Sequence, residues 1–211
     1  MTVVAQRAGE QVAEPAVAWS ESELDWGEPL SAAPILRPVA GARPEVDLRG
    51  AMRNFVTGVA VVTTHRDGAH DAVTVNSLVS LSLDPPLVAI SLRRDSRFGA
   101  DLLATREWNI CILDGESDAM AGSFARDRET RTAALATLPT RPGTRTGALL
   151  LEAPGWLECV LDRTYEVGDH TLFIGAVVAA GTDAPGARLL FAHGRFHVFD
   201  HSPDIRPGGT P

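Results

Sequence analysis

The sequence predicts a mainly β protein with short helices, folded as an antiparallel barrel or sandwich rather than as a doubly wound parallel sheet. Runs rich in β-branched residues are separated by hairpin and turn signals. Helical patterning is confined to three short segments, and no Gly-x-Gly-x-x-Gly motif follows a strand. Glycine (19) and proline (14) are frequent among the 211 residues, as is typical of a chain with many turns.

The individual elements follow from local patterns. Asp47 is a good N-cap for a helix over 48–54, and the β-branched run 55–64 ends in the hairpin signal His-Arg-Asp-Gly. The remaining helices are predicted at 97–104, capped by Asp95 or Ser96, and at 116–125, capped by Ser117. The remaining strands are predicted at 73–82, 87–92, 107–113, 156–167, 171–180 and 189–199.

The composition changes near residue 46, which divides the chain into an arm and one domain. Residues 1–45 carry seven acidic residues against three arginines, together with five prolines that resist regular structure. We interpret 1–45 as a flexible or partner-wrapping arm, 46–200 as the folded domain and 201–211 as a disordered tail. Trp19 and Trp26 are either docking anchors within this arm or part of an unstructured acidic tail.

Charge and composition exclude several classes of function. The net charge of −8 has the wrong sign for a protein that neutralises phosphates, so we expect no nucleic-acid partner. All 19 basic residues are arginine, which excludes a Schiff-base lysine and a lysine-containing phosphate loop. Cys111 and Cys159 lack ligand spacing and are expected in the core, so no metal site is predicted. No leader or apolar membrane span is visible, which predicts a cytoplasmic protein without membrane contact.

Three polar segments need a functional or a structural explanation. If 73–82 is one strand, a single face carries Thr74, Asn76, Leu78, Ser80 and Ser82. This face is either a solvated edge or a set of hydroxyl and amide groups that hydrogen-bond a planar ring. These two alternatives are equally compatible with the pattern.

The second segment is the Arg-rich turn 93–97, which joins a buried strand to a helix. Free amides at a helix N-terminus, with three arginines and Ser96 around them, form a good phosphate site. The alternative is an exposed capped turn whose arginines only offset the acidic residues of the chain.

The third segment is the Gly-Asp-His turn 168–170, where a lone histidine is more often solvent-exposed than catalytic. His193 and His197 should face the same side of the last predicted strand, but without a third ligand they form no metal site. No nucleophile motif or pair of catalytic carboxylates is present, which leaves a cofactor-dependent reaction.

Taken in order along the chain, these segments resemble the flavin reductase family. Members of this family are FMN-binding split-barrel flavoproteins, the reductase components of two-component flavin-dependent monooxygenases. The matching segments are 55–64, 74–88, 93–97, 156–159, 168–175 and 189–196, and they cover roughly residues 46–199.

The resemblance implies an antiparallel Greek-key split β-barrel that works as a homodimer. It further implies FMN or FAD as the flavin, NADH or NADPH as the hydride donor, and a partner monooxygenase that receives the reduced flavin. Carried over residue by residue, it assigns His170 to the nicotinamide and the phosphate to Arg93, Ser96 and Arg97. The flavin ring and ribityl chain would contact Val73, Thr74, Val75, Asn76 and Ser77, with Ser80 toward the phosphate and Arg195 and Phe196 near the pocket.

Two alternative functions remain at this stage. One is a flavoenzyme of the same fold that retains its flavin and oxidises an organic substrate directly. The other is a non-catalytic flavin-binding carrier or sensor. The segment 126–135 is richer in arginine than the family's usual Asp-Arg-Phe loop, so it either binds the extra phosphate of NADPH or forms a solvated loop.

Overall fold

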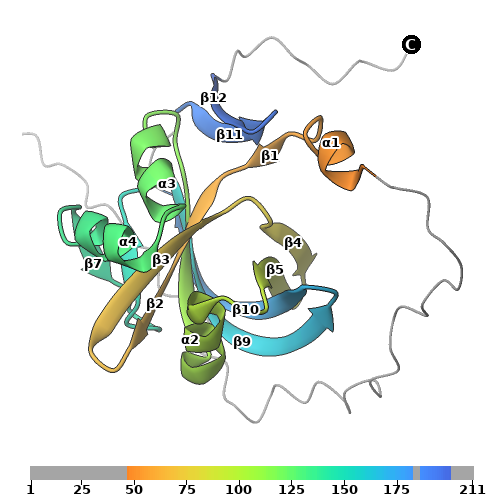
Figure 1. Cartoon of the computed structure of the whole chain (residues 1–211). Coiled ribbons are helices and arrows are strands. Elements are labelled where there is room, and N and C mark those ends of the chain that lie inside the picture. The colour runs from red at the N-terminus through yellow and green to blue at the C-terminus, as the bar shows by residue number, and fades with distance from the viewer. Residues whose placement is uncertain (1–46, 183–185, 201–211) are drawn as a thin grey trace, which may run out of the picture. The chain divides into compact units, whose positions relative to one another are not determined.

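The computed structural model describes residues 47–182 and 186–200, and within these ranges a seven-stranded antiparallel sheet forms the body of the domain (Figure 1). The strand order is β3-β2-β6-β9-β10-β5-β4. The bounds are β2 (Ala60–Arg66), β3 (Ala69–Val75), β4 (Val79–Leu83), β5 (Pro86–Arg93), β6 (Glu107–Ile112), β9 (Gly155–Val167) and β10 (His170–Thr182). The predicted arm 1–45 and tail 201–211 lie outside the described residues.

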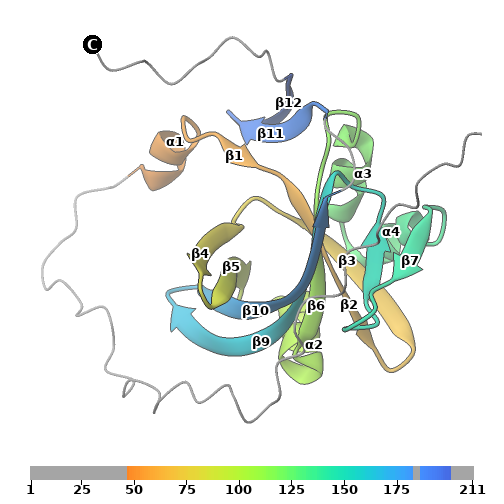
Figure 2. The same ribbon diagram turned by 180° about the vertical axis from the view of Figure 1, so that it is seen from behind.

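Two small antiparallel sheets accompany this body. One has the order β1-β11-β12 and lies at one end of the domain, as Figures 1 and 2 show; the other pairs β7 with β8. Their strands are β1 (Thr57–Gly58), β7 (Thr140–Pro142), β8 (Leu149–Leu151), β11 (Arg188–Ala192) and β12 (Arg195–Phe199). Mainly antiparallel strands with short helices are the architecture that the sequence predicted.

The described helices are α1 (Leu48–Met52), α2 (Arg97–Thr105), α3 (Asp118–Phe124) and α4 (Arg128–Leu135). The predicted caps Asp47 and Ser96 are confirmed, since their side chains accept the amide hydrogens of Gly50 (2.7 Å) and Gly99 (3.2 Å). Ser117 occupies the N-cap position of α3, but its hydroxyl donates to Asp114 instead (2.7 Å). No helix in the described part is long and apolar enough to span a membrane.

Helix α4 was not predicted from the sequence. Leu135 is its only buried residue, so the segment lacks the apolar periodicity that identifies an amphipathic helix. Its N-cap Asp127 accepts the Thr130 amide at 2.9 Å and holds the first turn.

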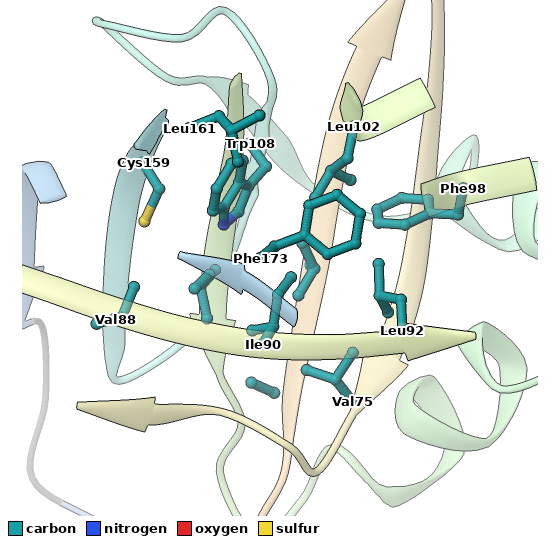
Figure 3. Packing of buried hydrophobic residues seen from close by; sticks show 13 residues of the cluster. Val75, Val88, Ile90, Leu92, Phe98, Leu102, Trp108, Cys159, Leu161 and Phe173 are labelled. Atoms are coloured by element: carbon teal, nitrogen blue, oxygen red, sulfur yellow. The ribbon is translucent and has the colours of Figure 1, made fainter. Parts of the chain in front are cut away.

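The interior of the barrel holds one hydrophobic cluster to which the sheet and α2 both contribute (Figure 3). Phe98 and Leu102 of α2 lie near Phe173 of β10, and all three are at most 1% exposed. Gly175 has no side chain because the Trp108 ring fills that space: a Cβ there would lie 2.4 Å from the ring. This packing fixes α2 against the sheet and therefore positions the α2 N-terminus.

A second cluster covers the outer face of β2, β3 and β6 under α3, α4 and β8. Successive side chains of β2 point to opposite faces of the sheet, so Val62 packs in the interior cluster and Val61 in the outer cluster. Cys159 and Cys111 are buried free thiols in the first and second cluster respectively, as predicted. Burial raises the pKa of Cys111 to about 11 and also raises the pKa of Cys159.

Two predicted strands are wrong in a way that matters for the site. The segment 73–82 is not one strand, because β3 ends at Val75, β4 begins at Val79, and a register shift follows between Ser80 and Ser82. The single polar face expected from Thr74 to Ser82 therefore does not exist.

The segment 189–199 is also two strands, joined by a hairpin turn with positive φ at His193 (50°) and Gly194 (76°). His193 and His197 thus do not share a strand face. The predicted hairpin at 65–68 is confirmed, and the run 55–64 is divided between β1 and β2.

Candidate functional site

A cleft of about 490 Å³ opens between the end of β5, the beginning of α2 and the turn from α3 to α4. It brings together five of the residues that the sequence predicted to bind a cofactor: Val73, Thr74, Arg93, Ser96 and Arg97. Its other lining residues are Leu92, Asp95, Phe98, Phe124, Ala125, Arg126, Arg128 and Arg131. A cavity of similar size beside α3 and β8 contains none of the predicted residues.

The α2 N-terminus supplies hydrogen-bond donors to this cleft. The first amides of a helix have no partner within the helix. The Ser96 hydroxyl accepts a hydrogen bond from the Gly99 amide, which leaves the amides of Arg97 and Phe98 available to an anion. Together with the partial positive charge of the helix end, these groups suit a phosphate.

Arg93 is engaged by its neighbour in this structure. Its guanidinium makes a two-pronged ion pair with Asp95, with N–O distances of 2.9 and 2.7 Å. The hydrogen bond raises the pKa of Arg93 and lowers the pKa of Asp95. Both side chains are exposed, so the pair is held weakly and Arg93 can exchange Asp95 for a phosphate.

The opposite wall of the cleft is held by buried carboxylates that sequence reasoning missed. Asp71 of β3 is 2% exposed and accepts two hydrogen bonds from Arg131 of α4, at 3.0 and 2.9 Å. Arg128 bridges Asp71 (3.4 Å) and Asp101 of α2 (3.1 Å). These pairs join α4 to β3 and α2, and they connect residues up to 60 positions apart, which no local motif reveals.

The predicted ring-contacting segment 73–77 is divided between the cleft and the protein interior. The Thr74 hydroxyl donates to the Ala121 carbonyl (2.7 Å), which leaves it only as an acceptor for a ligand. Ser77 bonds through its hydroxyl to the backbone of Ser91 in β5, and Val75 lies in the core. Asn76 is exposed between β3 and β4.

His170 does not line the cleft, but it begins β10 and its Cα pairs with that of Arg93, which does. Its Nδ1 contacts the Asp169 carboxylate at 2.8 Å, and this hydrogen bond lowers the pKa of Asp169. A carboxylate only accepts, so Nδ1 carries the proton and Nε2 is left for a ligand. The remaining predicted residues do not line the cleft either: Ser80 lies on β4, and Arg195 and Phe196 lie on β12.

The residues around the cleft fit a nucleotide cofactor. Arginines and helix amides suit its phosphate, while Val73 and Leu92 offer an apolar contact to a ring. In 47–182 and 186–200, no group of three His, Cys, Asp or Glu side chains is placed to hold a metal ion. The fold and cleft together define a β-barrel protein whose cleft suits a phosphate-bearing cofactor.

Comparisons with known proteins identify the family to which this β-barrel protein belongs. The model of the flavin reductase like domain matches residues 52–200, and the chain belongs to this family. The split-barrel fold that the sequence predicted is therefore confirmed.

Relatives and solved structures extend over most of the domain. An NADH-dependent FAD reductase of Streptomyces globisporus is 34% identical over 180 residues, which cover 83% of this chain and 97% of that protein. The NADH-dependent flavin reductase StyB of Pseudomonas fluorescens is 35% identical over 161 residues, 71% of this chain and 86% of that protein. BorF, the flavin reductase component of a bacterial two-component tryptophan halogenase, matches at 32% identity with a TM-score of 0.69, covering 74% of this chain and 98% of BorF.

Proposed function

We propose that this chain is an NAD(P)H:flavin oxidoreductase that reduces FMN or FAD by hydride transfer and supplies reduced flavin to a partner monooxygenase. The family match over residues 52–200 carries the proposal. The relatives support it, since two are named NADH-dependent reductases of flavin or FAD. A third is named the reductase component of a 4-nitrophenol 4-monooxygenase/4-nitrocatechol 2-monooxygenase.

The cleft explains how this chain would perform the reaction. A bound flavin supplies the ring that accepts the hydride. Ser96, Arg97 and the α2 amides would hold the phosphate, and Val73 would contact the ring from β3, since all of these residues line the cleft. His170, oriented by Asp169, would position the nicotinamide through Nε2.

No side chain has to move a proton in this step. The main task of the protein is to hold two planar rings at reacting distance, which accounts for a site without a nucleophile or a pair of carboxylates.

The proposal includes a homodimer. Strand β4 is a sheet edge whose apolar side chains point to solvent: Val79 is 48%, Leu81 47% and Leu83 89% exposed. Phe55 and Val56, which follow α1, are more than half exposed as well. Exposed apolar patches of this kind mark interaction surfaces, and we take a second copy of this chain as the partner that covers this one. The two free thiols agree with a cytoplasmic location, which is also part of the proposal.

The test is consumption of NADH and NADPH by the purified protein in air, with and without added FMN, FAD and riboflavin. The proposal predicts consumption that rises with the added flavin, and the same experiment reveals both cofactor preferences. Tight retention of flavin with poor turnover of added flavin would instead favour the enzyme that oxidises its own organic substrate.

A further inference from the structure

A second cavity, of about 500 Å³, lies between α3, β8 and the segment that follows α4, and we call it the α3–β8 groove. Its floor is apolar, since Met120, Leu138 and Leu151 line it. Leu151 belongs to the outer hydrophobic cluster, and Met120 and Leu138 pack against that cluster. A groove of this size with an apolar floor can hold a short peptide segment.

The charged residues that line this groove are all acidic. They are Asp114, Glu116 and Glu152, which we call its rim, whereas no arginine lines it. The Asp114 carboxylate accepts hydrogen bonds from the Ser117 hydroxyl (2.7 Å) and the Glu116 amide (3.1 Å). In 47–182 and 186–200, no ion pair involves the three carboxylates of the rim. The groove therefore suits a partner that combines an apolar side chain with a positive charge.

The last described strand, β12, ends beside this groove. Arg188 of β11 pairs with Phe199 of β12 and also with Asp114. Two strand spacings thus separate Asp114 from Phe199, which is about 10 Å. Val198 packs against Gly115, where a Cβ would lie 2.6 Å from the valine Cγ1. The segment that follows β12 therefore starts next to the rim.

That segment, 201–211, lies outside the described residues, and its sequence matches the groove at one place. Ile205 and Arg206 put a large apolar side chain directly beside a positive charge. Ile205 stands five residues after Asp200, and five extended residues span about 17 Å, which is enough to reach the floor. Asp204 precedes the pair and has the same sign of charge as the rim.

We propose that residues 201–211 dock in the α3–β8 groove of their own chain, with Ile205 on the apolar floor and Arg206 against the carboxylates of the rim. This placement takes the place of the disordered tail that the sequence predicts. The inference does not rest on the proposed function, because it involves neither flavin nor pyridine nucleotide. The docked segment would stabilise α3, whose Met120 lines the groove and whose Phe124 lines the cleft.

Disulfide trapping in the full-length protein tests the docking. Ile205→Cys is combined with Leu138→Cys on the floor of the groove, and the protein is oxidised mildly. The native Cys111 and Cys159 are buried thiols whose pKa values are raised, so they react slowly. We expect a disulfide within one chain that forms about tenfold faster than in the control, which combines Ile205→Cys with Leu103→Cys on the exposed face of α2.

Charge variants of the trapped protein test the contact with the rim. Arg206→Glu should slow disulfide formation about fivefold, because it replaces an attraction by a repulsion. Asp204→Asn should accelerate it about twofold, because it removes a charge of the same sign as the rim. Adding Glu116→Arg to Arg206→Glu should restore most of the lost rate, since the pair is then of opposite charge again.

Three results of the trapping experiment would overturn the inference. One is equal rates in the Leu138→Cys and Leu103→Cys proteins. Another is a rate that does not respond to the charge at 204 and 206. The third is a disulfide that joins two chains, seen as a doubled mass on a non-reducing gel, which would place the segment in the groove of a second copy.

Hydrogen exchange of the wild type gives an independent readout without any cysteine. Deleting residues 201–211 should accelerate exchange of the α3 amides about fivefold, because the helix loses a packing partner. The α2 amides should exchange at the same rate in both proteins. An α3 that exchanges equally fast with and without the segment would also overturn the inference.

Discussion

His170 is the one side chain whose proposed role is to meet the nicotinamide rather than the flavin. Replacing it with alanine should slow the reduction of bound flavin by pyridine nucleotide about tenfold, because a misplaced ring reacts more slowly. Flavin affinity should change less than about twofold, since the phosphate contacts remain. Rapid-mixing kinetics under anaerobic conditions measure the rate. His65→Ala, in the β2–β3 hairpin, is the control, and an unchanged rate in His170→Ala would refute the role.

Glu158 is a fully buried carboxylate on β9 that holds the loop before β8. It accepts the amide hydrogens of Thr144 (3.0 Å), Arg145 (2.8 Å) and Thr146 (3.0 Å). Burial alone would raise the pKa of Glu158, but these amide hydrogen bonds outweigh it and lower the pKa. The charged form is therefore favoured by folding.

The sign of the pH dependence follows from that lowered pKa. The contribution of Glu158 to stability should be complete above the ordinary glutamate pKa of 4.5 and should be lost as the pH falls through the lowered value. Glu158→Gln should lower the free energy of unfolding by about 1–3 kcal/mol at neutral pH, since the NH₂ group of the new glutamine faces backbone donors. It should also reduce the loss of stability that the wild type shows at low pH. Urea unfolding as a function of pH measures both effects. Glu152→Gln, at an exposed position, is the control. An undiminished loss of stability at low pH in Glu158→Gln would contradict this role of Glu158.

Single residues can be predicted from the sequence only where their role depends on neighbours in the chain. Ser96, Arg97 and His170 stand in short motifs; the first two line the cleft, and the third pairs in register with Arg93, which also lines it. Asp71 and Glu158 depend on partners 60 and 14 positions away, so their importance is invisible without the fold.

Helix α4 completes the cleft, and ion pairs to Asp71 and Asp101 attach it to β3 and α2 alongside the apolar contact of Leu135. Asp71→Asn removes the carboxylate that Arg128 and Arg131 share, and it leaves these guanidiniums beside a buried amide. Breaking one side of a buried ion pair costs about 3–5 kcal/mol, so we expect a loss of that order in the free energy of unfolding.

Denaturant unfolding measures the loss, with Asp67→Asn as the matched control. The Asp67 side chain is 87% exposed, and its removal should change the free energy of unfolding by less than about 0.5 kcal/mol. Equal effects of the two variants would show that α4 does not depend on Asp71.

The predicted elements differ from the observed ones at the breaks within 73–82 and 189–199 and at helix α4. Strands β5, β6, β9 and β10 agree within two residues, because long apolar runs identify them. The break between β3 and β4 contains neither glycine nor proline; the Ser77 hydroxyl, bonded to Ser91, holds the chain there instead. Helix α4 was missed because it buries only Leu135 and because its ion-pair partners, Asp71 and Asp101, are distant in the sequence.

For the whole molecule, the exposed β4 edge predicts a dimer in solution. Leu81→Glu should weaken it strongly, because burying an unpaired carboxylate in an apolar interface is costly. Sedimentation velocity measures the oligomeric state. Leu103→Glu, on the similarly exposed face of α2, is the control and should leave the state unchanged. A wild-type monomer would contradict the dimer directly.

The acidic segment 1–45 lies outside the described residues, and we propose that it docks on the second subunit or on the oxygenase. Deleting it should weaken dimerisation or the coupling of flavin reduction to oxygenation, since its acidic charges and tryptophans would no longer contact a partner. A deletion that leaves dimerisation, activity and coupling as in the full chain would contradict this proposal.

The central claim is that this barrel brings a pyridine nucleotide and a flavin together for hydride transfer. The most direct measurement mixes the flavin-loaded protein with NADH or NADPH in the absence of oxygen and follows the visible absorbance of the flavin. The account predicts rapid bleaching with at least one nucleotide, slowed in His170→Ala. A flavin that stays oxidised with both nucleotides would contradict the claim and identify a carrier or an enzyme with a different reductant.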